Sequence, residues 1–200
     1  MGRYAFLIDT YTTERQKILG AWAMFRDEDM SWRPAARARS VHEHMVHQCL
    51  SEDVWMKNFL GIDVSEPPLP ATETRYEFIK KYANASGRRL HELTTKPESW
   101  FEEHARFFDV DRSRAWILVR RVAHSAHHRG QLTTYLRSIG RDLFSTYGPT
   151  ADTGGLAQAG GVTIYAYPNV PALLEAESRG GEKAPLATPT GTSVTERPDR

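Results

Sequence analysis

Four long segments of the chain carry apolar residues at the three- and four-residue spacing of amphipathic helices, and none shows the strict alternation of strands. They run over these approximate ranges: Tyr4 to Arg26, Ser40 to Gly61, Arg75 to Leu93, and Arg112 to Ile139. The pattern predicts an all-α fold.

The ends of these segments are marked by residues that begin or stop helices. Ser40 is a good N-cap with Glu43 in the capping-box position, and Gly61 and Gly140 stand where helices end. Pro34 disfavours helical geometry at the residue before it, so the first helix stops before "SWRP". The proline-rich connector "DVSEPPLPATET" is long enough to cross a helical bundle instead of turning straight back.

The composition changes after Gly140, where the chain becomes rich in glycine and contains one short β-capable piece, "VTIYAY". We expect residues 1–150 to form the main domain and residues 151–177 to wrap it as a partly ordered extension. The last segment, 178–200, lacks aromatic residues and is rich in Gly, Pro, Thr and charge, so we expect a disordered tail.

Charge and cysteine content exclude several classes of protein. The chain has 26 basic and 25 acidic residues in 200, a net charge of +1, which is unlike a dedicated nucleic-acid binder. Cys49 is the single cysteine, so no intrachain disulfide can form. Charged residues interrupt the N-terminal apolar positions, and no apolar run approaches the length of a membrane span. We expect a cytoplasmic protein that binds neither nucleic acid nor membrane.

Candidate chemistry is concentrated in "HSAHHRGQL", residues 124–132 of the last long helix. With His124 at zero and a step of about 100° per residue, His128 falls at about +40°, near Ile117 and Tyr135 on the apolar face. His127 falls at about −60°, on the polar edge. His124 and His128 therefore point inward, and imidazoles four residues apart are a familiar half of a metal site. His127 is expected at the rim.

A third ligand has to come from another helix, and the second helix offers three histidines, His42, His44 and His47. His44 is closer to that helix's apolar face than His47 is. Helical periodicity alone does not choose between them.

Three stretches of the sequence together resemble the DinB/YfiT-like family: "SVHEHMVHQCLSEDVW", "AHSAHHRGQLTTYLRSIG" and "YGPTAD". The resemblance covers about residues 1–150 and implies a four-helix bundle with up-down-down-up connectivity and a crossover connection. It also implies three histidine ligands for a divalent metal, one from the second helix seven residues after a serine and two from an HxxxH pair. In this sequence these residues are His47, His124 and His128.

The resemblance further implies a metal-dependent enzyme, a thiol S-transferase or a hydrolase, that acts in detoxification or stress response. The expected metal is zinc or nickel, the expected substrate is a small molecule such as a low-molecular-weight thiol, and the expected assembly is a homodimer. The alternative is a non-catalytic metal-binding or interaction protein in which the ion is structural.

For other conspicuous residues we expect structural roles. Arg129 is expected to pair with a carboxylate, Gly130 to permit close helix packing, Cys49 to be a buried apolar residue, and Glu43 to cap its helix or to hydrogen-bond a ligand imidazole. His91 and His104 have no companions at ligand spacing and are expected at the surface. The following aromatic residues are expected in the core: Trp55, Trp100, Phe101, Phe107 and Trp116.

Overall fold

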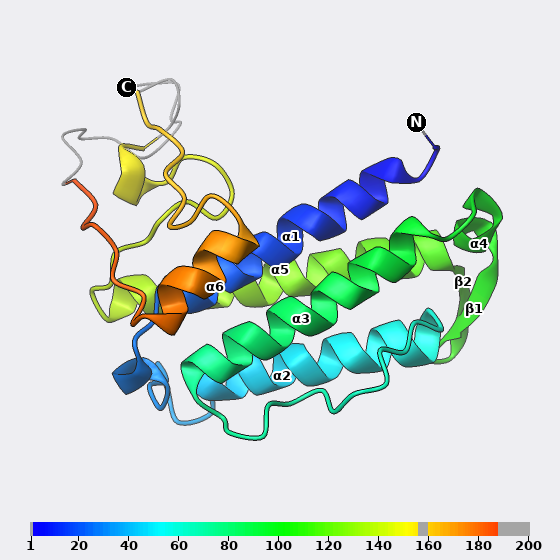
Figure 1. Ribbon diagram of the computed structural model, residues 1–200, viewed down its shortest axis with the longest axis horizontal. Helices are drawn as coiled ribbons and strands as arrows, with labels where there is room; N and C mark the ends of the chain where they lie inside the picture. The colour runs from blue at the N-terminus through cyan, green and yellow to red at the C-terminus, as the bar shows by residue number, and fades with distance from the viewer. Residues whose placement is uncertain (1, 156–159, 188–200) are drawn as a thin grey trace.

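The computed structural model describes residues 2–155 and 160–187, and most of these residues are helical. Four long helices account for the four periodic segments: α1 (Ala5–Ala23), α2 (Val41–Val54), α3 (Arg75–Thr94) and α5 (Arg114–Ser138) (Figure 1). The prediction of a chiefly helical chain is therefore confirmed.

The start of α2 follows from its first residues. The Ser40 hydroxyl accepts a hydrogen bond from the Glu43 N–H at 3.1 Å, and the Glu43 carboxylate accepts one from the Ser40 N–H at 2.7 Å. This capping box confirms the prediction. At the other end α2 continues into a π-helical turn, η2 (Trp55–Phe59), and the chain leaves the helix at Gly61, whose φ of 68° lies in the left-handed region.

The long connector is required because two consecutive helices, α2 and α3, run in the same direction. In Figure 1, α1 and α5 run from right to left, whereas α2 and α3 run from left to right. The segment between α2 and α3, residues 60–74, therefore returns along the length of the helices before α3 begins. α1 packs against α3 and α5, and α2 contacts the same two helices, so α2 and α5 face each other directly.

The apolar interior has two parts. One lies towards the end of the molecule where α1 ends and α2 begins. It includes Trp22, Met45, Phe78 and Leu132, all fully buried. The other lies towards the opposite end and includes Leu7, Met56, Phe101 and Ile117. Burial of these side chains is the main favourable contribution to folding.

A small sheet corrects the expectation that the fold is entirely α-helical. After the short helix α4 (Glu98–Glu102), strands β1 (His104–Phe107) and β2 (Val110–Ser113) form an antiparallel hairpin. Because Arg112 pairs in β2, α5 begins two residues later than expected, with Ser113 as its N-cap. Strands of four residues are too short for alternation to be recognised, and tertiary contacts of Phe107 with Trp55 and Trp116 hold the hairpin in place.

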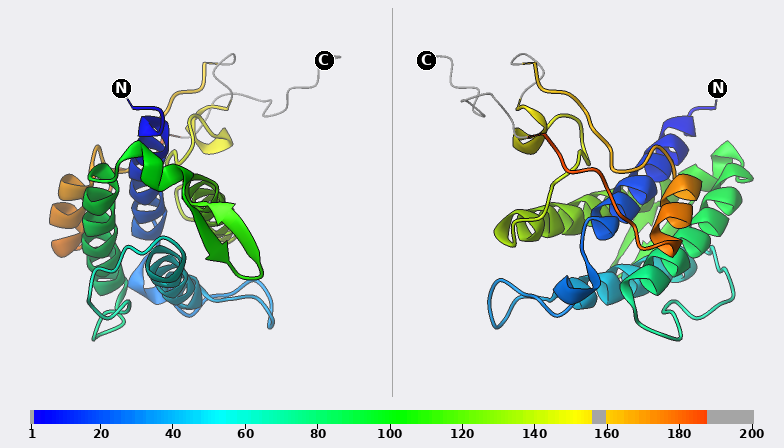
Figure 2. Two further views of the ribbon diagram at one scale, coloured as in Figure 1. Left: turned by 90° about the vertical axis from the view of Figure 1, so that its right-hand side faces the viewer. Right: turned by 60° about the vertical axis from the view of Figure 1, so that its left-hand side comes forward.

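The C-terminal extension contains a helix that the sequence pattern did not predict, α6 (Val170–Ser178), packed against α1 and α3 (Figure 2). The Asn169 side chain caps it, and Leu173 is buried in the core. The β-capable piece "VTIYAY" forms no strand. Ile164 and Ser145 instead form two hydrogen bonds. The Ser145 N–H donates to the Ile164 carbonyl at 2.7 Å, and the Ile164 N–H donates to the Ser145 hydroxyl at 2.9 Å.

Contacts continue beyond α6. The buried Glu177 carboxylate pairs with Arg75 at 2.5 Å and with Lys183 at 2.9 Å, and Leu186 packs against the core. Residues 188–200, the greater part of the predicted tail, lie outside the described residues, so disorder there stays a prediction.

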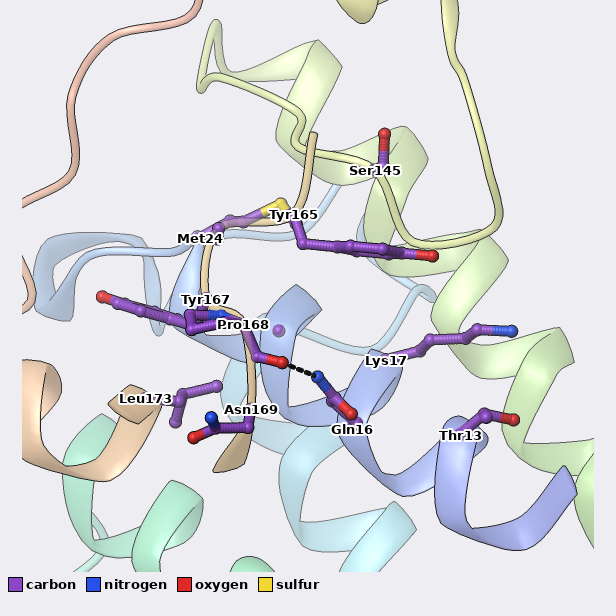
Figure 3. Close-up of a pocket in the computed structure, with 12 residues that line it drawn as sticks. Thr13, Gln16, Lys17, Met24, Ser145, Tyr165, Tyr167, Pro168, Asn169 and Leu173 are labelled. Atoms are coloured by element: carbon purple, nitrogen blue, oxygen red, sulfur yellow. Dashed lines mark hydrogen bonds between the residues drawn. The ribbon is translucent and has the colours of Figure 1, made fainter. Parts of the chain in front are cut away.

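A cavity of about 160 Å³ lies between α1 and the segment that leads into α6, lined by Lys17, Met24, Tyr165 and Tyr167 among others (Figure 3). It contains no histidine or carboxylate and shares no lining residue with the histidine site described below. Among the described helices, none combines the length and hydropathy needed to cross a membrane.

Candidate metal centre

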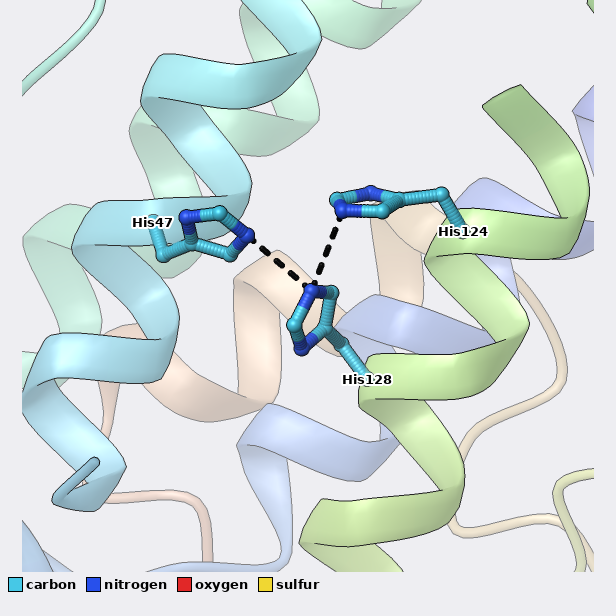
Figure 4. Close-up of side chains that lie close together, drawn as sticks. All are labelled: His47, His124 and His128. Atoms are coloured by element: carbon cyan, nitrogen blue, oxygen red, sulfur yellow. Dashed lines mark hydrogen bonds between the residues drawn. The ribbon is translucent and has the colours of Figure 1, made fainter. Parts of the chain in front are cut away.

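Three imidazoles from two helices meet at the α2–α5 contact. His47 extends from α2, and His124 and His128 extend from α5 (Figure 4). The Nε2 atom of His128 lies 3.0 Å from His47 Nε2 and 3.2 Å from His124 Nε2. The structure thus brings together the three histidines that the family resemblance singled out, with one ring nitrogen from each within 4.8 Å of the others.

The alternative residue on α2, His44, lies beside this cluster but does not join it. His44 is 2% exposed, its Nε2 lies 3.4 Å from the Tyr135 hydroxyl, and its ring meets His128 edge-on. Periodicity placed His44 closer to the apolar face of α2 but did not choose between the two, and His44 is indeed the more buried. The cluster, however, lies at the margin of the core, where the half-buried His47 reaches it.

The remaining histidines contribute no nitrogen to the cluster. His127 is exposed at its rim, as the angular argument predicted, and His91 and His104 are exposed elsewhere. His42 pairs with Glu73 at 2.6 Å.

All three clustered imidazoles are held in the neutral form. Burial, followed by the neighbouring charge of Arg121, lowers the pKa of His124 to about 4, and burial followed by His124 lowers the pKa of His128 to about 3. Burial, followed by Arg39, also lowers the pKa of His47. Neutral imidazole is the form that coordinates metal ions, so no proton has to leave before an ion binds at neutral pH.

Hydrogen bonding selects the coordinating nitrogen of His128. Its Nδ1 lies 3.0 Å from Gln131 Oε1, an acceptor, so the ring proton is on Nδ1 and the Nε2 lone pair faces the cluster. Gln131 belongs to the "HRGQL" block, and sequence reasoning gave it no role. The Glu43 side chain, the other candidate for this task, caps α2 and pairs with Arg33 instead.

The spacing of the nitrogens fits a small divalent ion. Zinc–nitrogen bonds of about 2.0–2.1 Å in a tetrahedral site place neighbouring ligand nitrogens about 3.3 Å apart. Two of the three separations, 3.0 and 3.2 Å, are close to this edge length, and the nitrogens of the third pair, His47 and His124, lie within 4.8 Å of each other. The single lone pair on His128 Nε2 can accept only one good hydrogen bond, although two imidazoles lie next to it. One cation could instead be coordinated by all three nitrogens.

A buried polar network behind the cluster was not predicted from the sequence. The Glu52 carboxylate accepts hydrogen bonds from the Tyr11 and Tyr82 hydroxyls at 2.7 and 2.5 Å. Burial opposes ionisation of Glu52, but Arg121 and Arg89 outweigh it and hold the carboxyl pKa below its ordinary value. The available signal was the position of Glu52, which is four residues before Met56 and therefore on the inward face of α2.

Arg121 connects this network to the histidines. Its Nη2 lies 3.5 Å from Glu52, and its Nη1 lies 3.0 Å from the Ser51 hydroxyl and 3.3 Å from His124 Nδ1. A guanidinium only donates, so this contact makes His124 Nδ1 an acceptor and leaves the ring proton on Nε2, which faces His128 Nε2 at 3.2 Å. Coordination of an ion through His124 Nε2 would therefore require the proton to shift to Nδ1 and the Arg121 contact to be given up.

Aromatic side chains form one wall of the site. Trp55 stacks on His124, with ring centroids 5.5 Å apart, and packs against Phe107 of the hairpin. Trp116 is 41% exposed, so the prediction that it lies in the core is wrong. Phe108, at the turn of the hairpin, is 64% exposed. Because the hairpin was not predicted from the sequence, the exposure of Trp116 near the start of α5 could not be predicted either.

Two further expectations for the "HRGQL" block have different outcomes. Arg129 pairs with Glu14 of α1 at 2.9 and 3.1 Å, which confirms that it binds a carboxylate. Gly130 is exposed, and a Cβ added there would meet no neighbouring atom, so the prediction that it permits close helix packing is wrong.

Cys49 is buried as predicted, and burial followed by Glu52 raises the pKa of its thiol to about 12.

Comparisons with known proteins agree with this description. The solved structures that are similar to this chain include two DinB-like proteins. The one from Bacillus cereus ATCC 10987 is 17% identical with a TM-score of 0.64, over 70% of this chain and 95% of its own. The one from Bacillus subtilis is 18% identical with a TM-score of 0.56, and the match covers 68% of this chain and 92% of that protein. No curated protein matches the chain significantly. Residues 4–155 match the DinB family, and the chain therefore belongs to that family.

Proposed function

We propose that this chain binds one divalent ion, zinc or nickel, through His47, His124 and His128, and uses it to catalyse transfer of a low-molecular-weight thiol or hydrolysis of a small molecule. The observation that carries the proposal is the convergence of three neutral imidazole nitrogens on one point beside an open cleft. A role in detoxification or stress response, the up-down-down-up bundle, the homodimer and the cytoplasmic location are parts of the same proposal, carried over from the family resemblance and the composition.

The donor set supports a catalytic ion more than a structural one. Among the residues that the structure describes, no cysteine or carboxylate joins the three histidines. Structural zinc sites use four protein ligands, whereas catalytic sites use three and leave a position for substrate. When bound, a divalent ion with three neutral ligands acts as a Lewis acid and lowers the pKa of a thiol or of water.

The chain's own residues would orient the site and limit its exposure to water. Gln131 holds the His128 proton on Nδ1, and the Trp55 ring stacks on His124. Trp55 shields one side, and the cleft lies open on the side of His127. A substrate would therefore approach from the cleft.

A non-catalytic protein with a structural ion is the second candidate. It is favoured by the origin of the three histidines on two helices, because an ion between α2 and α5 would clamp them together. The two candidates differ in what loss of the ion abolishes: activity in the first, and chiefly stability in the second.

Elemental analysis of protein purified without a polyhistidine tag or added metal tests the metal proposal. We expect about one zinc or nickel per chain, and strongly reduced occupancy in His47→Ala, His124→Ala and His128→Ala. His91→Ala, which changes an exposed histidine outside the cluster, is the matched control and should retain full occupancy. Full occupancy in His47→Ala would reject the ligand assignment.

Turnover tests the enzyme proposal. The metal-loaded protein should consume a small cellular thiol in the presence of bromobimane, or hydrolyse an ester or amide, and the metal-free protein and His128→Ala should not. Activity should return when zinc or nickel is added back to the metal-free protein. If the loaded protein exceeds the metal-free protein on no thiol, ester or amide, the structural-ion candidate replaces the enzyme.

A further inference from the structure

The cleft in front of the three histidines has the size of a small-molecule site. Its volume is about 480 Å³, within the range of about 300–1,000 Å³ that is usual for ligand pockets. Besides the three clustered histidines, its lining includes Arg39, Arg120 and His127. No acidic side chain lines it.

The two arginines come from separate parts of the chain. Arg39 immediately precedes the N-cap of α2, and its backbone carbonyl accepts a hydrogen bond from the buried Tyr135 hydroxyl at 3.1 Å, which fixes this loop against α5. Arg120 lies on α5 four residues before His124, so it projects from the same helix face about 6 Å away along the axis. Both side chains belong to exposed residues that border the cleft.

Neither guanidinium is neutralised within the described part of the chain. Other arginines near the site have carboxylate partners: Arg121 and Arg89 pair with Glu52, and Arg129 pairs with Glu14. Arg39 and Arg120 form no ion pair and no side-chain hydrogen bond with any described residue. An unpaired guanidinium beside a cleft retains its full capacity to bind a carboxylate or phosphate through two parallel N–H donors.

The charged residues that line the cleft are both basic. With a divalent ion bound, the cleft would carry two charges from the ion and one from each guanidinium, and none of opposite sign from its lining. Such a cleft attracts anions and disfavours cations.

We propose that the cleft selects small anionic molecules, with Arg39 and Arg120 binding a carboxylate or phosphate group of the ligand while its reacting end faces the three histidines. The assignment of the reacting end rests on the function proposed above. Anion binding by the two arginines does not depend on it.

Titrations with simple anions test this inference. Succinate and inorganic phosphate would be added to the zinc-loaded protein, with neutral succinamide as the uncharged analogue, and the dissociation constants would be measured by NMR. We expect both anions to bind and succinamide to show no saturable binding. Whichever anion binds more tightly identifies the group that the arginines prefer.

Each of the variants Arg39→Gln and Arg120→Gln should weaken anion binding by about tenfold, the usual effect of losing one charged hydrogen-bonding partner. Arg37→Gln is the matched control, because Arg37 is an exposed arginine of the same loop that does not line the cleft. Unchanged anion affinity in both cleft variants relative to Arg37→Gln would overturn the inference.

The metal-free protein separates this inference from the proposed function. There the anions should bind more weakly than in the loaded protein, yet still lose affinity in Arg39→Gln and Arg120→Gln. If the histidines take up no metal, the proposed function fails, but arginine-dependent anion binding would still support the cleft. If metal binds and the arginine substitutions have no effect in either form, the cleft inference fails alone.

Discussion

Individual side chains around His128 determine which nitrogen faces the centre. The ring of His128 is 3% exposed, and its only polar contacts besides the other two clustered histidines are with Gln131, among the described residues. The amide oxygen of Gln131 thus sets both the tautomer and the ring orientation. Such hydrogen bonds to the second ring nitrogen fix the orientation of a ligand imidazole and raise its basicity.

Gln131→Ala should therefore lower metal affinity by about 10- to 100-fold without unfolding the protein. Gln131→Glu should preserve affinity, since a carboxylate accepts the same hydrogen bond from Nδ1. Competition with a chromophoric chelator measures both. Thr134→Ala, at an exposed position one turn further along α5, is the control and should bind metal normally. An alanine variant with wild-type affinity would show that Gln131 does not position the ring.

Between elements, a buried ion pair of Arg129 and Glu14 joins α5 to α1. Both side chains are almost fully buried, and Arg129 also lies 3.4 Å from the Thr146 carbonyl oxygen and hydroxyl. This arginine follows His128 directly, so the pair holds the histidine-bearing turn of α5 against α1. Removing one member of such a pair leaves an unpaired buried charge.

Glu14→Ala should accordingly reduce the free energy of unfolding by about 3 kcal/mol or more, measured by urea denaturation of the metal-loaded protein. Glu175→Ala is the comparison, because Glu175 pairs with Arg179 at the surface, where the side chains are 67% and 68% exposed. Loss of such a surface pair costs about 1 kcal/mol or less. Equal effects of the two substitutions would mean that the buried pair contributes no more than a solvated one.

Across the whole molecule, stability is linked to pH through the buried neutral histidines. Burial lowers the pKa of His128 to about 3 and, followed by Arg39, that of His44 to about 4, whereas an unfolded chain binds protons at these residues near pH 6.5. The unfolded state therefore binds more protons below pH 6.5. Keeping these histidines neutral in the folded state does not lower the free energy of unfolding above that pH, but lowers it increasingly as the pH falls towards 4.

We expect the urea midpoint of the metal-free protein to be constant between pH 8 and 7 and to fall progressively from pH 6.5 to 4.5. His44→Gln should show a shallower fall, because it removes one proton-binding site from the unfolded state while leaving the three-histidine cluster intact. A midpoint that stayed level over the acid range, or a fall of the same steepness in His44→Gln, would contradict this linkage.

Local features of the sequence were enough to predict the four long helices and two of the three clustered histidines. Helical periodicity and the Ser40–Glu43 capping box depend on residues within one or two turns of each other, and so does the pairing of His124 with His128. The same reasoning put His127 at the rim. His47 was identified only through the family resemblance, since periodicity on α2 left His44 open.

Contacts between distant segments decided the remainder. His47 reaches the cluster only because α2 faces α5, and Arg39 and Arg120, 81 positions apart in the sequence, meet at one cleft for the same reason. Glu52 is tolerated in the core because Tyr11, Tyr82, Arg89 and Arg121 come to it from three other helices. The hairpin and α6 are short elements whose stability comes from packing on the long helices. Weak local preferences cannot specify such features, since the free energy that stabilises them arises only when the long helices have assembled.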